Sequence, residues 1–268
     1  MTSHLLRERA PIADSGWALL DGEARQRLAP ALAARRLVDF SGPHGWEHSA
    51  TNLGRTQPLA VSPREGLAAL QRRVLALAEL RADFTVSLQE LGDHERGALD
   101  VDLASLDAAA HRIAVAENVA VLRGWPEAGI AGIVGASPHE AKPLGEDPED
   151  YPRAVAGAVE LLLRSGVGGP YGMALGREQY RRVVETAEHG GHLLLDHLRK
   201  ILDGPIVWTP GIDGAVVLSL RGGDFVYDCG QDLSIGYQRH AEEVVHLYIE
   251  ESYGFVVASP DAAVALTA

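Results

Sequence analysis

The stretch from Val74 to Leu88 alternates between apolar and polar side chains, and it constrains the fold more than any other part of the sequence. Every even position is apolar, and most odd positions from Glu79 onward are polar. A period of two places the two sets on opposite faces of a β-strand. These fifteen residues are too many for an ordinary strand in a compact domain, where about five or six residues are usual. We therefore expect an arm that reaches out and pairs with another element.

The remaining periodicity predicts a mixed α+β chain without an internal repeat. Helices are expected over 14–35, 103–123, 153–164, 177–187 and 193–202, and strands over 171–175, 206–209, 215–220, 225–228 and 244–257. Pro30 should kink or end the first helix, because proline lacks the N–H group that a helix interior needs. The regular βαβ alternation that is typical of a doubly wound sheet is absent from the sequence.

Charge and composition exclude several classes of function. The 268 residues carry a formal net charge of −13 and show no basic patch, so nucleic acid is not expected as a partner. The N-terminus lacks the long apolar run of a signal peptide. No stretch approaches the roughly 18 apolar residues that a membrane helix needs. We therefore expect a cytoplasmic protein that does not act at a membrane.

No pattern of catalytic residues emerges, and we predict no enzyme activity. A Gly-x-Ser-x-Gly sequence is absent, and Cys229, the single cysteine, is predicted to be a small buried hydrophobe. The glycine-rich run 166–172 follows a helix and precedes a strand, which is the reverse of a dinucleotide-binding loop, so we interpret it as a turn. The segment 93–96 is interpreted as a solvated turn with local ion pairs.

Three histidines, His189, His192 and His197, lie close together in the sequence. No cysteine or carboxylate completes a recognised metal-binding spacing with them, so we predict no metal site within one chain. Two interpretations stay open. Several copies of the chain around a symmetry axis would form a ring of histidines, and otherwise the segment is a solvated loop.

A series of short motifs runs from one end of the chain to the other. They are 7–11 with Trp17, 35–40, 42–47, 80–85, 95–97, 129–133, 169–171, 221–225 and 230–237. In this order and with these gaps they resemble the encapsulins, which are bacterial shell proteins with the fold of HK97-type phage capsids. The resemblance covers essentially the whole chain.

This resemblance implies an α+β subunit with the HK97 phage major-capsid-like fold, made of a peripheral domain, an axial domain and an extended E-loop. The N-terminal arm and helix, with the start of the peripheral domain, would span 1–47. The other parts would be the E-loop at 48–80, the peripheral domain with its spine helix at 81–130, the axial domain at 131–220 and the C-terminal peripheral strands at 221–268. The overlong strand falls where the family's E-loop pairs with a neighbouring subunit.

The function that the resemblance implies is an icosahedral nanocompartment, a T=1 shell of about sixty copies. Relatives enclose cargo enzymes of iron storage and oxidative stress, such as dye-decolourising peroxidases or ferritin-like proteins, which carry a C-terminal targeting peptide. The family's docking patch for this peptide matches Leu28, Leu32, Arg35, Val38, Asp39, Asp232, Leu233 and Ile235. Apolar residues would seat the peptide, and the carboxylates would meet a basic residue on it. An ordinary structural role for all of these residues stays open.

The sequence departs from the family pattern in two places. Gln89 stands where some relatives carry a flavin-binding tryptophan, so we expect no flavin and no other cofactor. The predicted five-fold pore loop consists of Glu188, His189, Gly190, Gly191 and His192, where many relatives have Gly-Tyr-Pro. Small and histidine side chains predict a more flexible pore whose positive charge rises on protonation near pH 6.

Two other functions stay open at this point. The first is a phage major capsid protein on the same fold. Such proteins usually carry a scaffolding segment ahead of the N-terminal arm, whereas this chain begins at that arm, which favours the compartment. The second is a bacteriocin-like protein or protease. The missing signal peptide and the missing pair of nucleophile and base argue against it.

Overall fold

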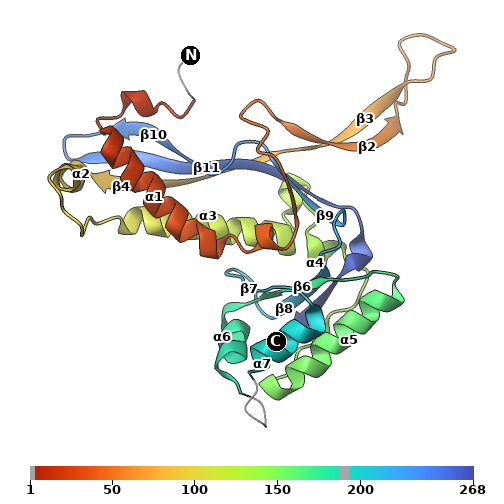
Figure 1. The fold of residues 1–268 in the computed structure, drawn as a ribbon. Helices are drawn as coiled ribbons and strands as arrows, with labels where there is room; N and C mark the ends of the chain where they lie inside the picture. The colour runs from red at the N-terminus through yellow and green to blue at the C-terminus, as the bar shows by residue number, and fades with distance from the viewer. Residues whose placement is uncertain (1–3, 188–192) are drawn as a thin grey trace.

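The computed structural model describes residues 4–187 and 193–268. They form an upper and a lower lobe, and a two-stranded arm extends from the upper lobe into solvent (Figure 1). The long strand β11 (Val244–Val257) and the long helix α3 (Ala104–Leu122) run through the upper lobe. The C-terminus lies in the lower lobe.

The sheet of the upper lobe is built around β11. Its strand order is β1 (Asp39–Ser41), β9 (Phe225–Cys229), β11 and β10 (Ser234–His240), and β4 (Ala78–Ser87) pairs with β11 as well. Strands β4 and β11 are antiparallel over the whole length of β4. Helices α1 (Asp14–Ala31) and α3 pack against this sheet, and α2 (Leu88–Glu95) follows β4 directly. Short 3-10 turns, η1 (Arg7–Arg9) and η2 (Ala34–Arg36), flank α1.

The lower lobe holds a second five-stranded sheet. Its order is β5 (Lys142–Pro143), β12 (Ala263–Thr267), β8 (Ala215–Ser219), β6 (Tyr171–Leu175) and β7 (Ile206–Trp208). The helices of this lobe are α5 (Tyr151–Arg164), α6 (Arg177–Glu185) and α7 (Leu194–Leu202). The segment predicted as one C-terminal block, 221–268, is therefore divided, because β9 to β11 join the upper sheet and β12 joins the lower one.

Short elements lie in the connections between the two lobes. They are η3 (Pro126–Ala128) and α4 (Ile133–Ala136) after α3, and η5 (Pro260–Ala262) between β11 and β12, whereas η4 (Pro148–Asp150) lies within the lower lobe between β5 and α5. The buried apolar side chains form two clusters, and α3 contributes to both. Leu106 and Ile113 belong to a cluster within the upper lobe, whereas Val121 and Leu122 belong to one that fills the lower lobe and extends to β9 and β11 of the upper sheet. One long helix thus links the two cores.

The alternating stretch 74–88 forms two strands rather than one, which corrects the prediction of a single long strand. Strand β3 (Leu70–Ala76) pairs with β2 (Ala50–Pro58) in the arm, whereas β4 joins the upper sheet. In β4 the predicted alternation is confirmed, since Ala82, Phe84 and Val86 are buried between exposed neighbours. The even positions stay apolar across Leu77, where the chain passes from one sheet to the other, so the apolar face alone did not show the division.

The structure agrees with the predictions for Pro30, for the run 166–172 and for Cys229, and it corrects the prediction for 93–96. The first helix ends at Ala31, with Pro30 in its last turn, and the run 166–172 connects α5 to β6 as expected. Cys229 is buried, and burial raises the pKa of its thiol to about 12. The segment 93–96 was wrongly interpreted as a turn, because it closes the helix α2, although the expected ion pair between Asp93 and Arg96 is present.

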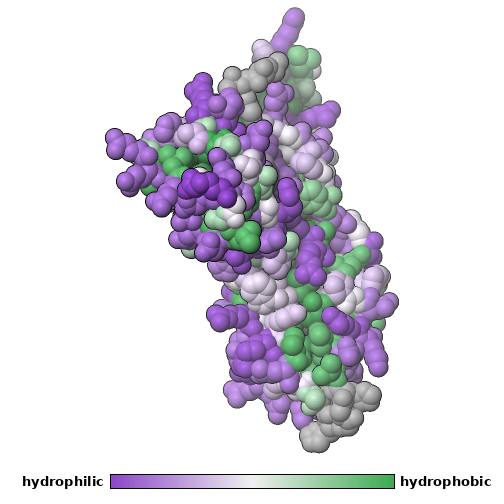
Figure 2. All heavy atoms as spheres, turned by 60° about the vertical axis from the view of Figure 1, so that its left-hand side comes forward, coloured by the Kyte–Doolittle hydropathy of each residue, from purple (hydrophilic) through white to green (hydrophobic). Residues whose placement is uncertain are grey.

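Apolar side chains reach the surface in patches. Figure 2 shows one such area over the lower part of the molecule, among hydrophilic residues. Large apolar residues of the lower lobe that are exposed include Val184 and Leu193. Among the helices in the described ranges, none is long and apolar enough to cross a membrane.

Candidate functional site: a groove between the first helix and strand β10

A groove of about 250 Å³ lies between α1 and the turn that leads into β10. Six of the eight residues predicted for peptide docking line it: Leu28, Leu32, Arg35, Asp232, Leu233 and Ile235. The other lining residues are Asp21, Ala24, Arg25, Ala29, Ser234 and Ile249. Residues that are far apart in the sequence therefore share one surface depression.

The local fold explains how the apolar side of the groove forms. Leu28 belongs to the buried stripe of α1, whose members from Trp17 onward recur every three or four residues. Across the groove, Ile235 pairs directly with Ile249 in the antiparallel ladder of β10 and β11, so both side chains lie on one face of the sheet. These three residues are buried, whereas Leu32 and Leu233 are half-buried beside them. The groove thus combines a fixed apolar floor with apolar side chains that remain accessible.

Arg35 forms the polar end of the groove and is held by three carboxylates. Its Nε donates to Glu117 Oε2, its Nη1 to Asp232 Oδ1 and its Nη2 to Glu251 Oε2, each over 2.7 Å. The side chains of Glu117 and Glu251 are fully buried, whereas that of Asp232 is 43% exposed. A basic group that enters the groove can therefore still reach Asp232.

The buried part of this network is strongly coupled. The hydroxyl of Tyr227 lies 3.0 Å from Glu117 Oε2 and from Glu251 Oε2, and it can donate to either of them. Burial alone would lower the pKa of Arg35, but the nearby charges of Glu117, Tyr227 and Glu251 raise it. Burial, and next the charge of Glu117, raises the pKa of Glu251 well above its ordinary value. Arg35 therefore stays charged and compensates the buried carboxylates.

Val38 and Asp39, the other two residues predicted for peptide docking, do not line this groove. They line a separate cavity of about 200 Å³, and Asp39 Oδ2 accepts a hydrogen bond from the backbone of Gly223 over 2.6 Å. The reason is topological: β1 starts at Asp39 and pairs with β9, and β9 and β11 separate it from β10 in the sheet order. The chain turns away from the groove directly after Arg35.

The remaining predicted residues lie elsewhere. Gln89 is exposed in the first turn of α2, and the absence of a flavin stays a prediction. The predicted pore loop, Glu188, His189, Gly190, Gly191 and His192, lies outside the described residues. His197 belongs to α7.

Sequence reasoning missed the buried partners of Arg35. Glu117 stands in the apolar stripe of α3, between Ile113 and Val121, where a carboxylate is out of place. Glu251 lies in the middle of β11 among buried neighbours. Both glutamates interrupt an apolar pattern, and this interruption could have identified them in the sequence, because a buried carboxylate needs a cationic partner.

Comparisons with known proteins agree with this architecture. A family model described as "encapsulating protein for peroxidase" matches residues 1–254. A type 1 encapsulin shell protein of Rhodospirillum rubrum is 45% identical over 267 residues, which cover 98% of this chain and 95% of the relative.

Solved structures with this fold belong to particles. A virus-like particle protein of Pyrococcus furiosus matches with a TM-score of 0.67 and 17% identity, over 93% of this chain and 98% of the other. The capsid of Myoviridae phage XM1 matches with a TM-score of 0.54 and 9% identity, over 87% and 89% of the two chains. These likenesses confirm the predicted capsid-type α+β fold.

Proposed function

Because the chain belongs to the encapsulin family of shell proteins, as the sequence motifs indicated, we propose that it builds a closed compartment from its own copies. The compartment is a cytoplasmic icosahedral shell of the T=1 type, with about sixty subunits. It encloses a cargo enzyme, either a peroxidase or a ferritin-like protein that serves iron storage or the response to oxidative stress. The subunit itself has a structural role.

The arm supports assembly from identical copies. Five of its large apolar side chains are solvent-exposed in the single chain, namely Leu59, Val61, Leu67, Leu70 and Val74, with exposed fractions of 46 to 81%. An isolated hairpin is at best marginally stable in water, and exposed apolar edges favour association. In a closed shell a neighbouring subunit covers these side chains. Because the shell is symmetric, every arm makes the same contact.

The groove supports cargo docking, and it is the observation that carries this part of the proposal. Its apolar floor suits a short apolar peptide, and Asp232 at its polar end suits a basic residue of that peptide. Arg35 holds Asp232 in place through its Nη1. The family description names a peroxidase as the protein that is enclosed, so a peroxidase is the first cargo to test.

The alternatives receive less support. Phage capsids share the fold, so the fold alone does not distinguish a compartment from a virus particle. The bacterial relative at 45% identity is named as a shell protein, which agrees with a structural role and favours the compartment over a phage capsid or a protease.

Replacing Leu233 with serine should lower cargo loading about tenfold or more. Burying a leucine side chain contributes about 1.5–3 kcal/mol, and about 1.4 kcal/mol corresponds to a factor of ten in binding. The measurement is co-expression with a fluorescent protein that carries the C-terminal residues of a peroxidase from the same genome. Fluorescence per purified shell then reports loading.

Val38→Ser is the matched control, because Val38 is also half-buried but lies outside the groove. It should load like the parent protein. Electron microscopy of both variants checks that shells form. Equal loading of Leu233→Ser and the parent, or an equal loss in both variants, would contradict docking in the groove.

A further inference from the structure

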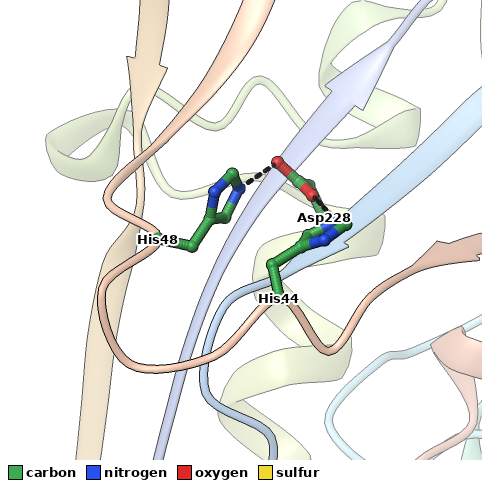
Figure 3. Close-up of side chains that lie close together, drawn as sticks. All are labelled: His44, His48 and Asp228. Carbon is green, nitrogen blue, oxygen red and sulfur yellow. Dashed lines mark hydrogen bonds and ion pairs between the residues drawn. The ribbon is translucent and has the colours of Figure 1, made fainter.

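Two histidines and an aspartate converge at the base of the arm, away from the groove. Figure 3 shows the imidazoles of His44 and His48 directed at the carboxylate of Asp228. The Nε2 atom of His44 lies 3.1 Å from Asp228 Oδ1, and that of His48 lies 3.0 Å from Asp228 Oδ2. One potential ligand atom from each residue can be chosen so that all three lie within 4.8 Å of one another.

The backbone holds this cluster in place. Asp228 is an inner residue of the upper sheet, with Ser41 of β1 paired on one side and Gly254 of β11 on the other. The segment from 42 to 49, which carries both histidines, is fixed to the end of β9. The amide of His44 donates to the carbonyl of Cys229 over 2.9 Å, and that of Gly45 to the carbonyl of Gly230 over 2.8 Å. The three side chains are therefore positioned before any ligand arrives.

The electrostatics of the cluster favour a cation. The side chain of Asp228 is only 8% exposed, and within the described residues its ion-pair partners are the two histidines alone. A buried carboxylate has lost its hydration and is stabilised by a cation bound beside it. Thr51 adds a hydrogen bond to Asp228 Oδ2 over 2.5 Å but no charge. The two histidine side chains are 42% and 29% exposed, which leaves a path from solvent.

We propose that His44, His48 and Asp228 bind one divalent transition-metal ion, with Zn²⁺ the best match. Two imidazole nitrogens and a carboxylate oxygen form a donor set that Zn²⁺ accepts, with water in the fourth position. Mg²⁺ and Ca²⁺ prefer oxygen ligands alone. Tetrahedral ligands at about 2.0–2.1 Å from zinc lie about 3.4 Å apart. The histidine nitrogens lie 3.1 Å and 3.0 Å from the two different oxygens of Asp228, and one ligand atom from each residue can be chosen within 4.8 Å of the others, so the side chains have to adjust to share one ion.

The position of the site implies a mechanical role. The ion would join the segment 42–49 to β9, directly before β2 starts the arm at Ala50. A metal bond there fixes the direction in which the arm leaves the upper lobe. The binding itself does not depend on the proposed function, because all three ligands come from one chain.

The test is metal binding by the purified full-length protein. The protein is stripped with EDTA, dialysed and titrated with Zn²⁺ against a chromophoric chelator. Co²⁺ is added to a second sample, since its visible absorption reports tetrahedral coordination. We expect one ion per chain, and a loss of affinity of at least about tenfold in His44→Ala and in His48→Ala.

Two further variants make the result specific. His111→Ala removes an exposed histidine of α3 and should bind the metal like the parent protein. His48→Gln keeps a hydrogen-bond donor near Asp228 but removes the imidazole ligand, and it should fold normally and lose the metal. Unchanged affinity in His44→Ala and His48→Ala, or no binding by the parent protein, overturns the proposal. Either result leaves the shell proposal untouched, because that one is tested by particle formation and cargo loading.

Discussion

Replacing Arg35 with methionine should destabilise the protein by about 3–5 kcal/mol, which is the usual cost of removing one partner of a buried ion pair. The methionine can fill a similar volume, but Glu117 and Glu251 then remain buried without a cation. For a chain of this size the thermal unfolding midpoint should fall by roughly 10 °C, measured by differential scanning fluorimetry.

The loss of stability in Arg35→Met should depend on pH. The raised pKa of Glu251 means that the folded protein takes up a proton more readily than the unfolded chain. That contribution to stability is fully present below the ordinary pKa of glutamate and is lost as the pH rises through the folded-state pKa. Without Arg35 the carboxylates rely on protonation alone. The difference between variant and parent should therefore be larger at pH 8 than at pH 5.

Two controls separate this effect from a general loss of positive charge. Arg36→Met changes the exposed neighbouring residue and should leave the midpoint nearly unchanged. Adding Glu117→Gln and Glu251→Gln to Arg35→Met removes the uncompensated charges and should recover most of the lost stability. An Arg35→Met protein as stable as the parent at pH 8 would show that Arg35 does not compensate these carboxylates.

Removing the end of the arm should abolish particle formation while the subunit still folds. A short glycine linker would replace residues 53–73, so that the first pairs of the β2–β3 ladder, Ala50 with Ala76 and Asn52 with Val74, are kept. Within the described residues, neither apolar core includes a side chain from this segment. Sedimentation velocity should therefore show small species, and circular dichroism should show a folded chain.

Point variants test the same idea with less disturbance. Leu70→Asp places a charge on an arm side chain that is 60% exposed, and it should strongly reduce assembly. Leu99→Asp makes the same change at a residue that is 99% exposed and lies outside the arm, and it should assemble like the parent. Normal assembly of the arm deletion would mean that the arm does not join the subunits.

Local pattern predicted much of the fold. The apolar stripe of the spine helix located α3 to within a residue at each end, and the alternation of 244–257 matched β11. The helix α2 was missed, because Gly92 and the polar residues after it look like a turn. What makes it a helix is the cap at Ser87, whose hydroxyl accepts hydrogen bonds from the amides of Gln89 and Glu90.

The site was predicted only where family resemblance supplied long-range information. Six of the twelve groove residues were found in this way, whereas Val38 and Asp39 lie outside the groove. Their position depends on which strand β1 pairs with, and nothing in the local sequence states this. The His48–Asp228 contact joins residues 180 positions apart, so no spacing rule could reveal it.

If identical copies of this chain close into a shell, the protein purified after expression without cargo should form uniform closed icosahedral particles under the electron microscope. The symmetry of these particles also gives the number of subunits and tests the T=1 assignment. A folded monomer or small oligomer under native conditions would contradict shell formation.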